Sequence, residues 1–111
     1  MKKKMGVWVG TLLLLAATGM AKAEVDADAA QALMKKSNCG KCHALDKKKD
    51  GPPCKETAKK YRDKPDAEQK LYIHLTTNPK VKVEGKEEEH TILKTKKEAD
   101  VRNVIRWILS R

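Results

Sequence analysis

The sequence predicts an all-α domain that encloses something other than protein side chains. After residue 24, apolar residues recur at helical spacing in the first and last segments, and no stretch alternates convincingly like a β-strand. Only four of the 111 residues are aromatic, none is phenylalanine, and 36% of the residues are charged. A chain of this length forms one small domain, and with so few large apolar side chains its own core would be marginal.

The N-terminal residues have the features of an export signal. Met1 to Lys4 is basic, residues 5–20 are uncharged and mostly apolar, and Ala21-Lys22-Ala23 fits the small-x-small pattern of a cleavage site. The apolar run is too short and too rich in glycine for a comfortable membrane span, although an uncleaved anchor is the alternative. We therefore expect a signal peptide at 1–23, a domain at 24–111, periplasmic localisation and no stable membrane insertion after cleavage.

The first half of the domain is expected to contain two helices and a loop. Small and apolar residues share one face of the segment 26–37, which predicts the first helix. Residues 38–53 are expected to form a loop, because Gly51-Pro52-Pro53 near its end forbids a continuing helix. A short helix over 54–61 follows, since proline suits a helix start.

The second half is expected to contain two further helices and a long loop. Asp66, with Gln69 three residues on, resembles a capping box and predicts a helix that ends near residue 78. Residues 80–96 show no sustained period and are expected to form a long loop. From about residue 97, apolar residues at i, i+3, i+4 and i+7 predict the last helix.

The chemistry is expected to come from Cys39-Gly40-Lys41-Cys42-His43. Two cysteines three positions apart on a helical turn point the same way, so both thiols can add to the two vinyl groups along one porphyrin edge. His43 then turns its imidazole toward the iron as the proximal ligand. The motif therefore predicts one haem c, held covalently through two thioethers at Cys39 and Cys42.

Three other interpretations of the cysteines were open. A redox dithiol of the thioredoxin type needs strands around a βαβ unit, and none is predicted. A zinc site would combine Cys39, Cys42, His43 and Cys54, but adjacent residues are awkward as two ligands of one tetrahedral ion. A structural disulfide is possible in an exported protein. Cys54 is unpaired if the other two cysteines hold haem, and we expect it to be a small buried apolar residue.

The order of these features resembles the small single-haem class I cytochromes c of bacteria. The carrying residues are the Cys-x-x-Cys-His motif, the Gly-Pro pair, a Lys-rich short helix ending in Tyr61, and the ending Trp107-Ile108-Leu109-Ser110. The resemblance implies the class I cytochrome c fold, in which the first and last helices cross around the haem. It also implies that the carbonyl of Pro52 accepts the proximal His43 Nδ1 proton, which would orient the ring.

The chain departs from that family at the distal iron ligand. The family supplies a methionine from the loop before the last helix, and this sequence has none there. His90 lies close to that position and is the expected distal ligand, so the metal ligands are predicted to be His43 and His90. The alternatives are His74, Met34, a lysine from the loop, or an open site.

These features predict an electron carrier rather than an enzyme. Bis-histidine ligation implies a lower potential than histidine–methionine ligation, because methionine raises it. An open or displaceable distal site would instead indicate a haem-based ligand-binding or sensing protein. The formal charge is +10, and loss of four lysines with the signal leaves about +6. Lysines around the motif favour redox protein partners with an acidic docking face; the compartment and the few aromatics argue against nucleic acid.

Overall fold

The computed structural model describes Gly6, Gly10 and residues 24–111. The predicted signal peptide at 1–23 lies outside the described residues, those two glycines aside. The described helices are α1 (Ala27–Lys36), the 3₁₀ turn η1 (Cys39–Lys41), α2 (Cys54–Tyr61), α3 (Ala67–Thr76) and α4 (Glu98–Leu109), and the strands are β1 (Lys80–Val83) and β2 (Lys86–Glu89). Within this part of the chain, no helix is both long and apolar enough to cross a bilayer.

The first and last helices pack against one another, as predicted. Ala30 of α1 is buried together with Val104, Ile105 and Ile108 of α4, and Leu33 packs on this cluster. At the N-terminal end of α1 the contact is also polar. The backbone N–H of Asp26 donates to Asn103 Oδ1, and Asn103 Nδ2 donates to the Asp26 carbonyl, both at 2.9 Å.

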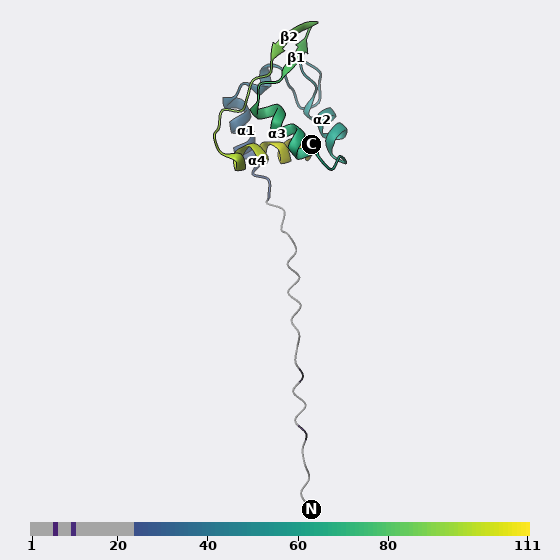
Figure 1. Cartoon of the computed structure of the whole chain (residues 1–111), viewed down its shortest axis with the longest axis vertical. Coiled ribbons are helices and arrows are strands. Elements are labelled where there is room, and N and C mark those ends of the chain that lie inside the picture. Colours follow the sequence, from purple (N-terminus) through teal and green to yellow (C-terminus); the bar gives the residue numbers. More distant parts are fainter. Residues whose placement is uncertain (1–5, 7–9, 11–23) are drawn as a thin grey trace, which may run out of the picture.

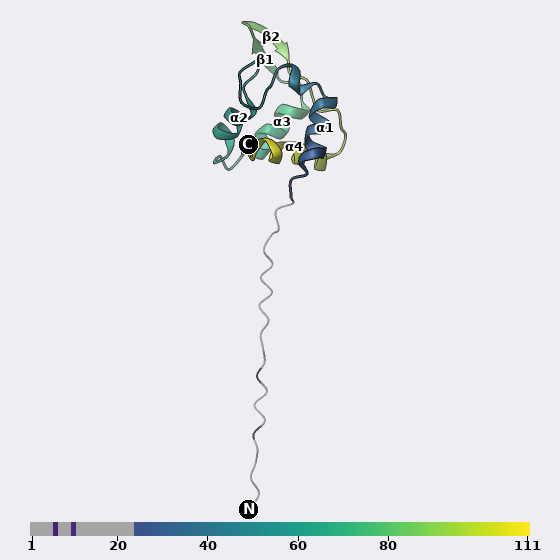
Figure 2. The ribbon, with the colours of Figure 1, turned by 180° about the vertical axis from the view of Figure 1, so that it is seen from behind.

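The other two helices complete a small bundle on α4. Figures 1 and 2 show α3 between α1 and α2, with α4 crossing beneath them. Leu71 and Leu75 of α3 are buried, and so is Ala58 of α2. The predicted capping box at the start of α3 is wrong, because the Asp66 side chain accepts no capping hydrogen bond and instead pairs with Lys70 at 3.2 Å.

The segment predicted as a long loop contains a β-hairpin. β1 and β2 pair antiparallel, with Lys80 opposite Glu89 and Val83 opposite Lys86, and project from the end of the domain opposite α4 (Figure 1). The turn is made by Glu84 and Gly85, both with positive φ (50° and 78°). The architecture of the described residues is thus helical with one small sheet added.

The segment after the hairpin is fastened to the bundle at two points. Leu93 is buried, and its N–H donates to the Leu75 carbonyl of α3 at 3.0 Å. The Lys94 N–H donates to the hydroxyl of Ser37 at 2.9 Å. Ser37 follows α1 directly and is 2% exposed, so this contact joins the end of the first helix to the segment before the last.

Candidate functional site

The Cys39–His43 segment folds as one tight turn after α1. The Cys39 carbonyl accepts hydrogen bonds from the N–H groups of Cys42 (3.2 Å) and His43 (3.0 Å). Both cysteines are half-buried and are free thiols. Burial raises the pKa of the Cys39 thiol.

The His43 ring is held by the loop that follows it. Nδ1 lies 2.8 Å from the Pro52 carbonyl oxygen, which can only accept, so Nδ1 carries the hydrogen and Nε2 keeps a free lone pair. Gly51 packs on the same ring: a Cβ there would lie 2.8 Å from His43 Nδ1. The Gly51 N–H donates to the Cys42 carbonyl at 2.7 Å, which closes the loop over the motif.

All three histidines of the chain gather at one place. The ring centroids of His43 and His90 are 6.1 Å apart, and those of His74 and His90 are 4.1 Å apart. His43 comes from the turn after α1, His74 from the last turn of α3, and His90 directly follows β2. The sequence offers His74 and His90 as alternative distal ligands, whereas the fold brings the two side chains side by side.

The pKa values of His74 and His90 are both lowered, which favours the neutral form of each ring. Burial, together with the charges of His90 and His43, lowers the pKa of His74. Burial and the charge of His43 lower the pKa of His90, and the Thr91 backbone acts in the opposite direction. A neutral imidazole keeps a lone pair, which is the form that binds a metal ion.

Exposed apolar side chains lie beside the histidines in the sequence. The large hydrophobic residues that are exposed are Leu45 (43%), Ile73 (48%) and Ile92 (37%). Each stands within two residues of one of the three histidines. Exposed apolar side chains close to the histidines in the sequence are compatible with a site that receives a flat apolar ligand.

Residues 27–111 match the family described as cytochrome c. The chain belongs to the cytochrome c family. Among solved structures, the class 1 cytochrome MtoD of Sideroxydans lithotrophicus ES-1 is 48% identical, with a TM-score of 0.74 over 78% of this chain and 97% of that one. Wild-type cytochrome c552 of Nitrosomonas europaea is 30% identical, with a TM-score of 0.57 over 72% and 96%.

A curated relative, cytochrome c-552 of Nitrosomonas europaea, is 43% identical over 60 residues. The match spans 54% of this chain and 54% of that relative, so it covers about half the length of each. The full length of the domain is matched instead by the family and by MtoD.

The cytochrome c family carries covalently attached haem c, and the residues of this chain fit such a group. The neighbouring thiols of Cys39 and Cys42 suit attachment to a porphyrin edge, and the free His43 Nε2 suits an iron. A buried nitrogen without a partner, His90 Nδ1, lies in the same place.

The competing interpretations of the site residues find less support in the structure. Among the described residues, no group of three or more histidine, cysteine or acidic side chains is arranged to hold an ion directly, as the zinc interpretation required. Met34, a possible ligand, packs half-buried against the hydrophobic core. Cys54 is 8% exposed within that core, as expected of a small apolar residue.

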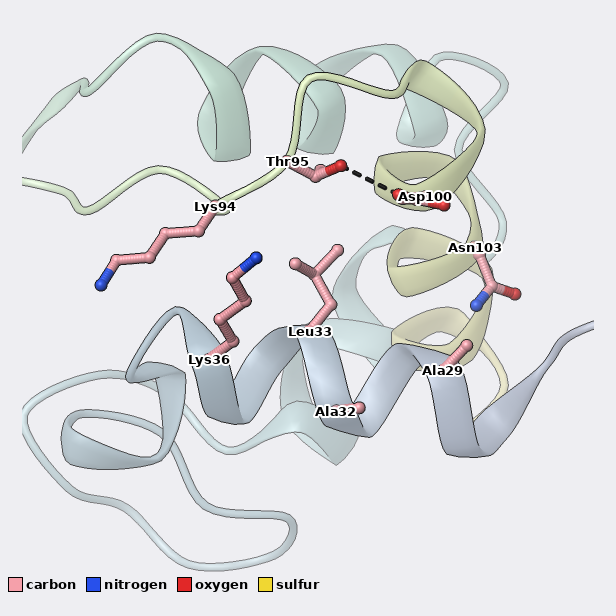
Figure 3. Close-up of a pocket in the computed structure, with 8 residues that line it drawn as sticks. All are labelled: Ala29, Ala32, Leu33, Lys36, Lys94, Thr95, Asp100 and Asn103. Atoms are coloured by element: carbon pink, nitrogen blue, oxygen red, sulfur yellow. Dashed lines mark hydrogen bonds between the residues drawn. The ribbon is translucent and has the colours of Figure 1, made fainter.

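A hollow of about 320 Å³ between α1 and α4 is separate from the histidines (Figure 3). Its lining residues are Ala29, Ala32, Leu33, Lys36, Lys94, Thr95, Asp100 and Asn103. Three of its polar side chains are already hydrogen-bonded, because Thr95 Oγ1 donates to Asp100 Oδ2 at 2.9 Å and Asn103 Nδ2 donates to the Asp26 carbonyl. We assign this hollow no role in the chemistry.

Proposed function

We propose that the chain is an exported electron carrier with one haem c, bound through Cys39 and Cys42 and ligated by His43 and His90. A haem c iron takes up or gives away one electron, and its potential depends on its axial ligands. Ligation by two histidines makes this a low-potential member of the family, since methionine ligation raises the potential. The protein therefore passes single electrons between redox proteins and transforms no substrate.

The observation that supports this proposal best is the 6.1 Å separation of the His43 and His90 ring centroids. Metal–imidazole bonds are about 2 Å long, so two imidazoles on opposite sides of one metal ion have centroids about 6 Å apart. The free lone pair at His43 Nε2 and the lowered pKa of His90 favour the same ligand pair.

The protein groups around the iron have separate tasks. The Pro52 carbonyl fixes the His43 tautomer and increases the basicity of Nε2. His90 is held through its backbone: its N–H donates to the Pro79 carbonyl at 2.8 Å, and its carbonyl accepts from Asn78 Nδ2 at 3.1 Å.

Spectroscopy of the oxidised holoprotein tests the ligand pair. Near-infrared magnetic circular dichroism is expected to show a bis-histidine, low-spin iron, which His90→Ala converts to a high-spin form. Carbon monoxide added to the reduced wild type should bind slowly or not at all. A high-spin wild type that binds carbon monoxide rapidly would instead assign the chain to ligand binding or sensing.

We also propose that the partner presents an acidic face. Nine lysines between residues 35 and 60, the part of the sequence around the attachment motif, have exposed side chains: Lys35, Lys36, Lys41, Lys47, Lys48, Lys49, Lys55, Lys59 and Lys60. Clustered charge of one sign attracts the opposite sign at long range and raises association rates in a salt-dependent way. The periplasm, reached by the signal at 1–23, is the proposed compartment.

Small redox reagents test this surface without a known partner. Oxidation of the reduced protein by anionic ferricyanide should slow when Lys47, Lys48 and Lys55 are changed to Glu, and oxidation by cationic hexaammineruthenium(III) should accelerate. The matched control changes Lys94, Lys96 and Lys97 to Glu, which alters net charge equally in the segment before α4, where Lys36 is the one member of the surface that lines the same hollow. Equal effects of the two triple variants would contradict a local docking surface.

A further inference from the structure

The distal side of the site holds two imidazoles, although an iron has only one distal position. His90 is the proposed ligand, which leaves His74 beside it without a role. The two rings are 4.1 Å apart between centroids and tilted by 49°. At that separation their edge atoms are in contact.

The two rings are supported independently of one another. His74 lies in the last turn of α3, a helix fixed by the burial of Leu71 and Leu75. His90 is held by the Pro79 carbonyl and the Asn78 side chain at the base of the hairpin. Their contact is therefore imposed by the fold and does not depend on a flexible segment that brings them together.

The Nδ1 atoms of His43 and His90 differ in whether they have a hydrogen-bond partner. His43 Nδ1 donates to the Pro52 carbonyl, whereas His90 Nδ1 is buried and has no partner. A histidine that binds a metal through Nε2 carries a hydrogen on Nδ1, and that hydrogen almost always meets an acceptor. A neutral imidazole offers one nitrogen lone pair as an acceptor.

We propose that His74 is the positioning residue for the distal ligand, accepting the hydrogen of His90 Nδ1. The proposal rests on the proposed ligation by His90. In the described structure the rings touch without a hydrogen bond, so the proposed bond requires the two side chains to reorient. The bond would fix the orientation of the His90 ring and increase the electron density that Nε2 gives to the iron, as Pro52 does for His43.

Three variants of the holoprotein test this role. His74→Phe keeps a ring and removes the acceptor, His74→Gln keeps an acceptor oxygen, and Tyr72→Phe is a control on the same helix. In His74→Phe the ferric iron should stay low-spin, while carbon monoxide displaces His90 in the reduced protein at least about tenfold faster. The reduction potential should rise. His74→Gln should recover most of both changes, and Tyr72→Phe should leave both unaltered.

The outcomes separate this proposal from the ligation on which it rests. If His74→Phe behaves like the wild type while His90→Ala becomes high-spin, His90 is the ligand but its hydrogen meets another acceptor, such as the Thr91 carbonyl. If His74→Phe is high-spin and His90→Ala is not, His74 is itself the ligand. If neither variant changes the spectrum, the proposed ligation fails. A fall in thermal stability shared equally by His74→Phe and His74→Gln, with unchanged potential, would indicate a structural role only.

Discussion

The His43 imidazole shows how single residues control the candidate site. His43 is fixed by backbone groups of one short loop, because the Pro52 carbonyl binds its Nδ1 and Gly51 lies against its ring. Neither contact depends on a side chain that can rotate away. The orientation of the ring is therefore set by the path of the chain through 51–52.

We expect Gly51→Ala to disturb this ring. The added Cβ would lie 2.8 Å from His43 Nδ1, so the ring or the loop must shift. Overpacking of this kind costs about 1–3 kcal/mol, and the free energy of unfolding in urea should fall by that amount. Gly40→Ala is the matched control, because a Cβ at Gly40 meets nothing within 4 Å. Equal free energies of unfolding for the two variants would show that the loop shifts without a cost in stability.

We expect the buried thiol of Cys54 to be unreactive in the folded protein. Burial raises its pKa, with the Arg111 charge acting in the opposite direction, so less thiolate is present at pH 8 than in an exposed cysteine. Alkylation by iodoacetamide at pH 8 should be at least about tenfold slower than in urea-unfolded protein, and should accelerate as the pH approaches the raised pKa. Equal rates in the two states would place the thiol outside the core.

The sequence predicted those site residues whose chemistry is local. Cys39, Cys42 and His43 lie within one turn, so their spacing alone indicated their geometry. The adjacency of His74 and His90 could not be read in the same way, because they lie on different elements and meet only through the path of the hairpin. The fit of Gly51 against the His43 ring likewise requires the folded loop.

At the scale of elements, the hairpin is the feature that the sequence did not reveal. Its strands have four residues each, and neither contributes a buried side chain, so the alternation of Lys and Val in β1 carries little hydrophobic signal. Its turn uses Glu84 at positive φ, where Asn or Asp is the usual signal for a two-residue hairpin turn. α1 and α4 were recognisable because each buries an apolar face, whereas α2 was predicted from the proline before it and α3 from a capping box that does not form.

We expect Asn78 to fix the base of this hairpin in two ways. Its φ of 51° is tolerated by Asn, and its Nδ2 donates to the His90 carbonyl. Asn78→Gly removes only the hydrogen bond, at a cost of about 0.5–1.5 kcal/mol. Asn78→Ala adds the left-handed backbone penalty of about 1–2 kcal/mol. Urea unfolding should rank wild type, Gly and Ala in that order, and Ala at least as stable as Gly would contradict it.

At the scale of the whole molecule, the protein core is small. The largest fully buried side chains are Ile105, Val104 and Ser37, and three large apolar residues near the histidines are exposed. The crossing of α1 and α4 was predictable from the apolar spacing of both helices and from the family resemblance. The part of the core that the haem would fill was not predictable, because the sequence indicates the haem only through its attachment motif.

We therefore expect the chain without haem to lack stable tertiary structure. The double variant Cys39→Ser, Cys42→Ser, produced without haem attachment, should lose most of its far-ultraviolet helical signal and unfold without a cooperative transition, since small domains need a full core. Circular dichroism and urea titration beside the holoprotein make the comparison. A cooperative transition at the same urea concentration would show that the protein side chains suffice.

The hydrogen bond made by the Ser37 hydroxyl bears on how much the site rearranges during electron transfer. It binds the Lys94 N–H, so the segment leading into the attachment cysteines is tied to the segment that leaves His90. The two segments that carry the proposed axial ligands, His43 and His90, are therefore joined to each other by this hydrogen bond. A rigid link between these segments keeps atomic rearrangement small when the iron changes its oxidation state. A small reorganisation energy makes electron transfer fast in both directions.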